Sequence, residues 1–237
     1  MNFKKILRGI KAKKNPEIIV SECVSGNIKE EILRDIANSE FSSAIEKIKN
    51  LGFNIKGKNL FEIENSLDID LMNKWKKESE KIKTIRNYVE RQIDMLNLKA
   101  IIRIKLMNVD ASEFINSTVE GKFLKKNILS SINALEINKE NFNSEGINNI
   151  IRATPYKDIF KGALDDYKES KSLEKLELLI EKASIEFGLI QNPLSLDYVL
   201  SYLKSMWFDV RNVRIILIGK KYKLNPEEIE KLIIKIQ

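Results

Sequence analysis

Residues 202–229 read YLKSMWFDVRNVRIILIGKKYKLNPEEI, and this stretch decides the fold class. Apolar residues recur here at spacings of three and four, which predicts one stripe of a long helix from about Pro193 to about Lys220. The stripe, which we expect to be a packing face, consists of Val199, Leu203, Met206, Val210, Val213 and Leu217. The helix stops before Asn225-Pro226-x-Glu228, a pattern in which the Asn oxygen caps the Glu amide as the next helix begins.

The central segment of this stretch, which begins at Asn212, has similar copies at two other places in the chain. The three segments are NFKKILRGIK from Asn2, NLKAIIRIK from Asn97 and NVRIILIGK from Asn212. The offset of 115 residues between the last two also pairs Asp94 with Asp209, and it pairs IANSEFSSAI with IRATPYKDIF. Such self-similarity predicts internal repeats. The predicted segments are the tail of a truncated first repeat at 1–28, a second helical repeat at 29–125 and a third helical repeat at 126–237.

The basic amino terminus belongs to this repeat. Residues 1–14 carry six Lys and Arg and no acid, whereas the whole chain has a net charge of +7, so the remainder is nearly neutral. A basic amphipathic start is typical of a transit peptide or a membrane-surface helix. Because residues 2–11 align with helices inside the later copies, we predict an internal helix instead.

Further helices follow from the same periodicity. The stripe that precedes the middle motif is Ile82, Ile85, Val89, Ile93 and Leu96, and Asp110-x-x-Glu113 after the motif predicts another capped helix start. Shorter helices are predicted at 27–37, 40–50, 121–136, 155–169 and 173–188. No segment alternates convincingly in the way that a strand does. The predicted fold is all-α and is built from internally repeated helical segments.

Composition excludes several classes of site. The chain contains no histidine and a single cysteine, Cys23, which excludes Ser-His-Asp and Cys-His triads, zinc fingers and internal disulfides. No catalytic, cofactor-binding or metal-binding residue is therefore assigned. No run approaches the roughly 18 apolar residues of a membrane span, and no signal peptide is visible, which predicts a soluble cytoplasmic protein.

Residues 52–59, GFNIKGKN, come close to a phosphate-binding loop. That loop needs Ser or Thr after its lysine and must join a strand to a helix. Asn59 stands where the hydroxyl is needed, and the preceding SSAIEKIKN is predicted to be helical. We therefore interpret this stretch as a polar connection between two helices.

Three acidic pairs are candidates for general acid–base groups, namely Asp165-Asp166, Asp68 with Asp70, and Glu227-Glu228. General acid catalysis needs one carboxyl in an apolar pocket, and all three pairs lie in polar surroundings or at predicted helix starts. Structural roles are favoured for all of them.

A set of cations is a candidate nucleic-acid surface, namely Arg103, Arg211, Arg214, Lys220, Lys221 and Lys223. They alternate with apolar positions, and neither a stacking platform nor a nucleic-acid motif accompanies them. No nucleic-acid partner is predicted. Trp75, Trp207 and Phe208 are expected to be core or subunit-interface anchors rather than cofactor contacts.

Residues 202–229, with Ala153-Thr154-Pro155-Tyr156 before them, resemble the C-terminal third of the C subunit of archaeal-type and vacuolar-type rotary ATPases, which is related to the d subunit of the vacuolar enzyme. That family consists of three similar all-helical segments, each with a Thr-x-Tyr-like site followed by an Asn-centred helix. The resemblance covers essentially the whole chain. Where the family tends to have Lys-Glu before the acidic residue of its last motif, this chain has Met206-Trp207 before Asp209.

The resemblance implies a non-catalytic central-stalk rotor subunit that links the shaft to the membrane proteolipid ring and transmits torque for proton or sodium transport. It implies no cofactor, no small-molecule substrate and a peripheral position on the cytoplasmic face of the membrane, reached through the ring rather than by insertion. Most of the first segment is missing, so we expect a shortened subunit, a split gene product or a misplaced start. The alternatives are a helical adaptor outside any ATPase and a nucleic-acid-binding helical protein that uses its basic first residues.

Overall fold

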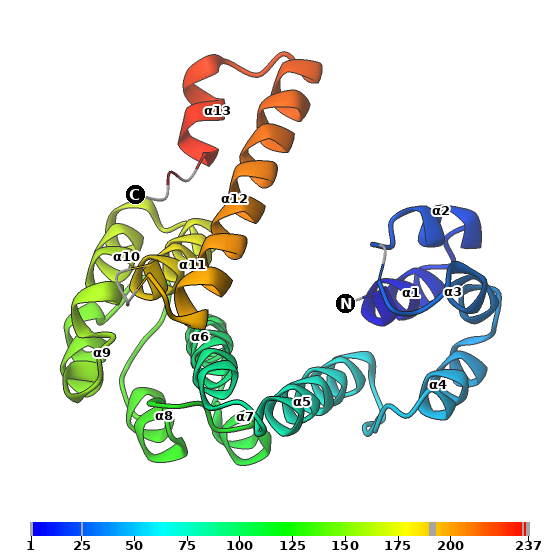
Figure 1. Cartoon of the computed structure of the whole chain (residues 1–237), viewed down its shortest axis with the longest axis horizontal. Coiled ribbons are helices and arrows are strands. Elements are labelled where there is room, and N and C mark those ends of the chain that lie inside the picture. The colour runs from blue at the N-terminus through cyan, green and yellow to red at the C-terminus, as the bar shows by residue number, and fades with distance from the viewer. Residues whose placement is uncertain (1, 25, 190–192, 234, 236–237) are drawn as a thin grey trace. The chain divides into compact units, whose positions relative to one another are not determined.

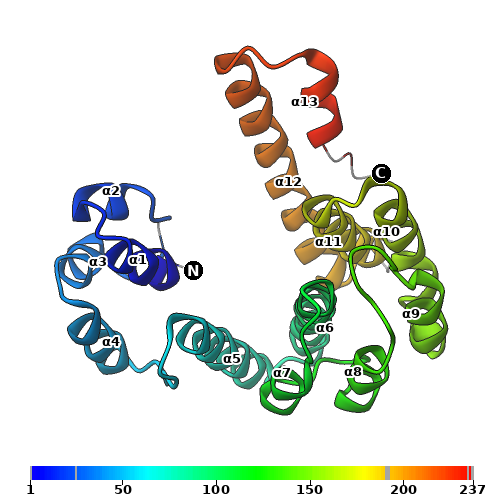
Figure 2. The same cartoon turned by 180° about the vertical axis from the view of Figure 1, so that it is seen from behind.

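The computed structural model describes residues 2–24, 26–189, 193–233 and 235. Within these ranges every regular element is a helix and no strand occurs, so the predicted all-α class is confirmed (Figure 1, Figure 2). The chain divides into two compact units, Met1–Lys74 and Trp75–Gln237. This division by contacts differs from the repeat boundaries at 28/29 and 125/126, which stay a prediction.

The first unit is a small helical cluster around the amino-terminal helix. Its helices are α1 (Asn2–Lys11), α2 (Pro16–Ser21), α3 (Glu30–Ala37), α4 (Phe41–Asn50) and most of α5 (Leu60–Ser79). Apolar residues of α1, among them Ile6 and Leu7, are fully buried in its core. Arg8 of α1 donates two hydrogen bonds to Glu64 of α5, at 2.6 and 2.5 Å. The basic first residues thus form an internal helix of this unit.

The second unit is larger and its core surrounds α6. Its elements are α6 (Lys83–Leu106), α7 (Ser112–Ser117), α8 (Lys126–Asn133), α9 (Ser144–Ile150), η1 (Ile151–Ala153), α10 (Lys157–Ser170), α11 (Leu173–Leu189), α12 (Leu196–Lys221) and α13 (Pro226–Leu232). Helix α6 packs on α8, α11 and α12, and α11 also packs on α10 and α12. Leu98, Ile101 and Ile102 of α6 are fully buried in one cluster with Tyr156 and Phe160.

The predicted helices are present, with two corrections. The helix expected at 121–136 is shorter because the backbone amides of residues 122–124 are hydrogen bonded to the Asp94 side chain and not to a preceding turn. The Asp110–Glu113 cap is also wrong: Asp110 accepts from the Ser112 amide at 3.2 Å and from the Asn133 side chain at 2.7 Å. At α13 the predicted capping box of Asn225 and Glu228 is present.

One turn geometry recurs after the three helices that carry the Asn motif. Lys13, Asn108 and Lys223 each have a left-handed backbone, with φ of 54°, 59° and 56°. Asn108 and Lys223 lie 95 and 210 positions after Lys13, which are the offsets of the motif itself. The amide of the next residue closes each turn on a carbonyl five residues back, and a left-handed residue after the helix end makes this bond possible. The same turn geometry therefore follows all three helices that carry the Asn motif.

The Asn residue of the motif ties its helix to a later segment. Asn2 donates to the Val24 carbonyl at 2.6 Å and accepts from the Val24 amide at 3.0 Å. Asn97, which is buried, donates to the Val119 carbonyl at 2.8 Å and accepts from the Thr118 hydroxyl at 2.8 Å. In both copies the partner backbone lies 22 positions downstream, so the amide side chain has the same structural role twice.

Candidate interaction surface

The loop of residues 52–59 is a connection between α4 and α5, as predicted. The Lys58 amide donates to Glu62 Oε2 at 2.7 Å, and the Glu62 amide donates to Asn59 Oδ1 at 2.9 Å. The donors at the start of α5 are thus satisfied by a carboxylate and an amide oxygen of the chain itself. The geometry is that of a capped helix start that follows another helix.

The three acidic pairs have structural partners. Asp68 pairs with Lys4, Asp70 with Lys74 at 2.9 Å and Asp166 with Lys175 at 2.5 Å, while Ser144 donates to Asp165 at 3.3 Å and Glu228 completes the α13 capping box. Glu227 lies in the first turn of α13, where negative charge meets the positive end of the helix dipole. In the described part of the chain, no group of three or more Cys, Asp or Glu residues is arranged to hold a metal ion.

A polar junction in the core centres on Asp94, which is fully buried. Its carboxylate accepts hydrogen bonds from the amides of Lys122 (3.1 Å), Phe123 (2.9 Å) and Leu124 (2.9 Å) and from the Tyr156 hydroxyl at 2.8 Å. Burial raises the pKa of Asp94, and these hydrogen bonds oppose that shift. Burial also raises the pKa of Tyr156, which keeps its hydroxyl a donor. The junction fastens α6 to the segment before α8 and to the start of α10.

A buried ion pair joins α6 to the beginning of α12. Arg91 Nη2 lies 2.8 Å from Asp197 Oδ1, and Arg91 Nη1 donates to Asp197 Oδ2 at 3.3 Å. A two-point contact between a guanidinium and a carboxylate fixes orientation as well as distance. No sequence pattern indicates this pair, because its members are 106 positions apart.

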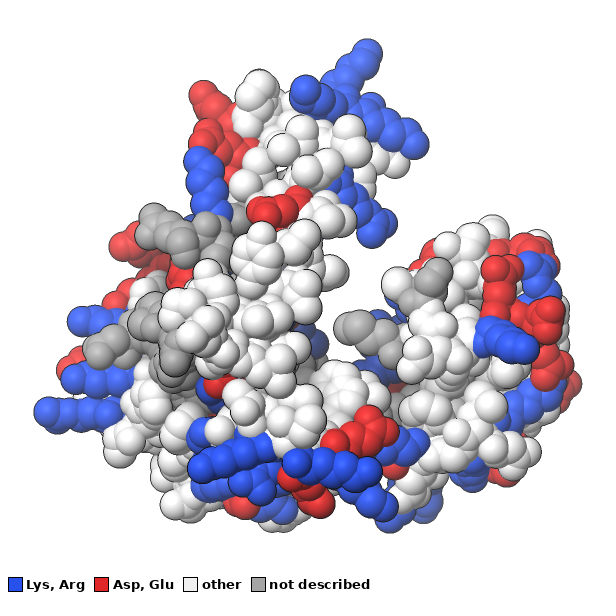
Figure 3. All heavy atoms as spheres, in the orientation of Figure 1, with Lys and Arg blue, Asp and Glu red and all other residues white. Residues whose placement is uncertain are grey.

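Helix α12 presents an apolar side to solvent. Its predicted stripe of Val199, Leu203, Met206, Val210, Val213 and Leu217 is between 45% and 67% exposed, so the chain itself does not cover this predicted packing face. The residues of α12 that are buried are Asp197, Ser201, Phe208 and Gly219, on another side of the helix. We call the stripe, together with the exposed Tyr202 and Trp207, the α12 apolar face. Figure 3 shows the surface over α12 as largely uncharged.

An apolar face of this length is a signature of an interaction surface, because monomeric proteins rarely expose large contiguous apolar patches. Trp207 is exposed on it, while the adjacent Phe208 is fully buried and packs edge-to-face with Trp207 at 5.3 Å. Phe208 is thus the core anchor, and Trp207 has the position of an interface anchor. Asp209 is exposed beside them and has no hydrogen bond or ion pair with any residue in the described ranges.

The six candidate cations divide into two that have partners within the chain and four that are exposed. Arg103 pairs with Glu177, with Nε 3.1 Å from Oε1, and Arg211 donates to the Leu232 carbonyl at 3.4 Å. The other four, Arg214, Lys220, Lys221 and Lys223, are exposed along the last turns of α12 and the turn after it. Positive charge is favourable at a helix carboxyl end, so their position has a structural explanation.

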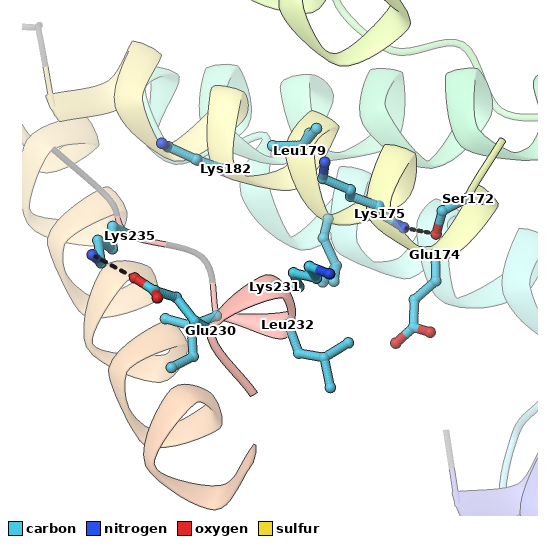
Figure 4. A pocket seen from close by; sticks show the side chains of 11 residues that line it. Ser172, Glu174, Lys175, Leu179, Lys182, Glu230, Lys231, Leu232 and Lys235 are labelled. Carbon is cyan, nitrogen blue, oxygen red and sulfur yellow. Dashed lines mark hydrogen bonds and ion pairs between the residues drawn. The ribbon is translucent and has the colours of Figure 1, made fainter. Parts of the chain in front are cut away.

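A cavity of about 490 Å³ separates α11 from α13 (Figure 4). Lys175, Leu179 and Lys182 line it from α11, and Glu230 and Leu232 line it from α13. Among its residues Lys235 and Glu230 form an exposed pair with the ammonium 3.9 Å from the carboxylate. The mixed lining brings no reactive group together. Helix α13 packs on α12 and stands away from α11 at this place.

None of the helices in the described ranges combines the length and the hydrophobicity that a membrane span requires. In the described residues the fold combines buried polar junctions with an exposed apolar face on α12, and such a face is typical of a surface that contacts a partner. The comparisons with known proteins specify the class of this protein.

Residues 1–232 match the family described as ATP synthase (C/AC39) subunit, so the chain belongs to this family. The A-type ATP synthase C subunit of Methanocaldococcus jannaschii is 25% identical over 219 residues, which are 87% of this chain and 52% of the relative. The corresponding C subunits of Haloferax volcanii and Archaeoglobus fulgidus are 27% and 25% identical, over 64% and 63% of this chain and 42% and 41% of their own lengths. No solved structure gives a significant match.

The chain thus spans about half the length of the curated relatives it matches. The family resemblance predicted from the Asn motif and residues 153–156 is confirmed, and the interpretation as a subunit of an A/V-type ATPase, rather than an enzyme by itself, agrees with it.

Proposed function

We propose that this chain acts as a non-catalytic central-stalk rotor subunit of an A/V-type ATP synthase or ATPase. In this role it links the central shaft to the membrane proteolipid ring on the cytoplasmic face and transmits torque that is coupled to proton or sodium transport. Membership of the ATP synthase (C/AC39) subunit family supports the proposal. The proposed segments remain 1–28, 29–125 and 126–237, one repeat tail and two repeats.

The observation that carries the proposal is the α12 apolar face. A subunit that transmits torque needs a broad contact with its neighbour and a stiff connection behind that contact. The face supplies the contact with eight exposed apolar side chains on one helix. Behind it, the buried Arg91–Asp197 pair and Phe208 hold α12 on the rest of its unit. The ring or the shaft is therefore expected to cover this face.

The test is recovery of the tagged chain, expressed from its own locus, from detergent-solubilised membranes. The wild-type chain should carry rotor and ring subunits with it. The double variant Val210→Asp with Val213→Asp places two charges on the exposed face and should lose them, since burying an unpaired carboxylate in an interface is costly. The matched control Met107→Asp with Val109→Asp changes two exposed apolar residues away from α12 and should retain them.

A complete and active ATPase that lacks this chain would reject the proposal and favour the adaptor alternative. Nucleic-acid binding through the basic first residues has less support, because Lys4 and Arg8 pair with Asp68 and Glu64. A salt titration of binding to duplex DNA checks it, since phosphate contacts predict affinity that falls steeply with salt.

A further inference from the structure

The second unit contains a cavity that neither the α12 apolar face nor the α11–α13 gap shares. Its volume is about 410 Å³, within the usual range of small-molecule sites. Four helices form it, with Trp75 from α5, six residues from α6, Glu181 from α11 and Lys204 from α12; the α6 residues are Tyr88, Val89, Gln92, Met95, Leu96 and Lys99. Most of this lining is apolar or aromatic, so the body of any ligand held here must be apolar.

The polar end of the cavity is a cluster of two ammonium groups around one carboxylate. Lys204 Nζ lies 3.2 Å from Glu181 Oε1, and Lys99 Nζ lies 3.8 Å from Glu181 Oε2. Lys204 also donates to the Gln92 side-chain oxygen at 2.6 Å. The three charged side chains are only 19–25% exposed. The cluster therefore carries one excess positive charge in a poorly solvated place.

That excess charge is more than helix packing needs. A single lysine would be enough to neutralise Glu181, whereas a second ammonium without its own anion is costly when removed from water. Burial lowers the pKa of Lys204 accordingly, while Glu181 opposes that shift. An anionic group beside Lys99 and Lys204 would balance the charge and satisfy ammonium donors that have no further acceptor in the cluster.

We infer that this cavity binds a small amphiphilic carboxylate, with its apolar body against Trp75, Met95 and Leu96 and its carboxylate between Lys99 and Lys204. The apolar lining disfavours an inorganic anion, and the charge disfavours a neutral or cationic amphiphile. The inference concerns a bound ligand rather than a substrate, and it does not rest on the proposed rotor function.

Trp75 lines the cavity, so its fluorescence can report binding there. The chain contains two tryptophans, so Trp207→Phe leaves Trp75 as the single indole. In that background, titration with decanoate should change the Trp75 emission saturably, with submillimolar affinity. Decylamine and acetate should bind at least tenfold more weakly, because the first has the wrong charge and the second lacks the apolar body. Equal binding of decanoate and decylamine would overturn the assignment.

Two substitutions separate a binding role from a packing role. Lys204→Met keeps the unbranched apolar stem of the side chain and removes its ammonium group. It should weaken decanoate binding about tenfold or more, the usual value of a hydrogen bond to a charged group. Lys99→Met at the same cluster should weaken binding similarly, and it remains a test if Lys204→Met does not fold. The control Lys182→Met removes a paired lysine of α11 outside the cavity and should leave binding unchanged. Unchanged binding in Lys99→Met and in folded Lys204→Met overturns the inference.

A carboxylate on an apolar stem could also come from the acidic side chain of a protein. Titration with acetyl-Leu-Leu-Glu-amide decides between these sources. Weak or absent binding of the peptide supports a free amphiphile as the ligand. Binding as tight as that of decanoate would overturn this assignment in favour of an acidic side chain of a protein partner.

Discussion

Helices α6 and α12 carry the same motif 115 positions apart, but apolar residues of the motif that are buried in α6 have exposed counterparts in α12. Leu98 and Ile102 of α6 are fully buried in a cluster that includes residues of α8, α10 and α11. The residues at the matching positions of α12, Val213 and Leu217, are 55% and 64% exposed. The comparison shows that periodicity identifies which side of a helix is apolar, but the presence of a covering helix decides whether that side is core or interface.

The acidic residues of the two helices differ in the same way. Asp94 of α6 is buried and accepts four hydrogen bonds, three from backbone amides and one from Tyr156. Asp209 stands at the matching position of α12 and is exposed. A partner that covers α12 as α8 and α11 cover α6 would therefore meet an apolar stripe and an exposed carboxylate that can accept hydrogen bonds.

The largest expected effect is in the core of α6. Ile102→Ala should lower the free energy of unfolding by about 3 kcal/mol, because a buried aliphatic side chain is replaced by a cavity. Leu217→Ala, the matched change on α12, should lower it by about 0.5 kcal/mol or less. Urea unfolding followed by circular dichroism measures both. Equal losses would mean that the α12 apolar face is covered within the chain.

The losses in unfolding free energy caused by Asp94→Asn and by Asp209→Asn should differ by a smaller amount. Asp94→Asn replaces one of the two acceptor oxygens with an NH₂ group and so leaves at least one buried donor without an acceptor, which should cost about 2 kcal/mol. Asp209→Asn should change stability by less than about 0.5 kcal/mol. Urea midpoints at pH 7 give both values, and a cost at Asp209 as large as at Asp94 would show a partner for Asp209 within the chain.

The loss in unfolding free energy caused by Asp94→Asn should also depend on pH. Because the folded-state pKa of Asp94 is raised, the folded chain holds its proton more tightly than the unfolded chain. The part of the Asp94 contribution that depends on its titration is therefore fully present below its unfolded pKa and is lost as pH rises through its folded pKa. The difference between wild type and Asp94→Asn should shrink over that window. A difference that grows with pH would reverse the assigned direction.

The Tyr156 hydroxyl, which donates to Asp94, should contribute more to stability than the exposed Tyr202 hydroxyl. Tyr156→Phe removes a buried hydrogen bond of 2.8 Å and should cost about 1 kcal/mol, less than Asp94→Asn because the three amide bonds remain. Tyr202→Phe, on the exposed side of α12, should cost almost nothing. Urea midpoints of the two variants give the comparison, and a larger loss for Tyr202 would contradict it.

Much of the fold could be predicted from the sequence, because long helices with a clear apolar stripe are a local property. Helices α10 and α11 begin and end within about two residues of the prediction. The start of α8 could not be predicted, since Asp94, which takes the amides of residues 122–124, lies 28 to 30 positions earlier. The bounds of helix α5 were not predicted, because it has no single clear apolar stripe.

The candidate site was predictable only in part. The apolar stripe of α12 was found from its spacing, but its exposure depends on what packs against it, which spacing does not encode. The cavity beside Trp75 had no sequence signal, because Glu181 and Lys204 belong to different helices and Lys99 to a third. The Asn motif was the one signal that led to both the repeat and the family.

The smallest effect on stability, and the sharpest test of the comparison, is expected from charge on the α12 apolar face. Val210→Asp with Val213→Asp should change the urea midpoint only slightly, since both side chains are already in water. The same variant should bind less of a fluorescent dye that reports exposed apolar surface, because it interrupts the stripe at its centre. Leu98→Asp, at the α6 position that matches Val213, should unfold the second unit, since Leu98 is fully buried in its core. If both variants unfold, α12 is an internal helix like α6; if only Leu98→Asp does, the two copies of one motif have separated into a core helix and an interface helix.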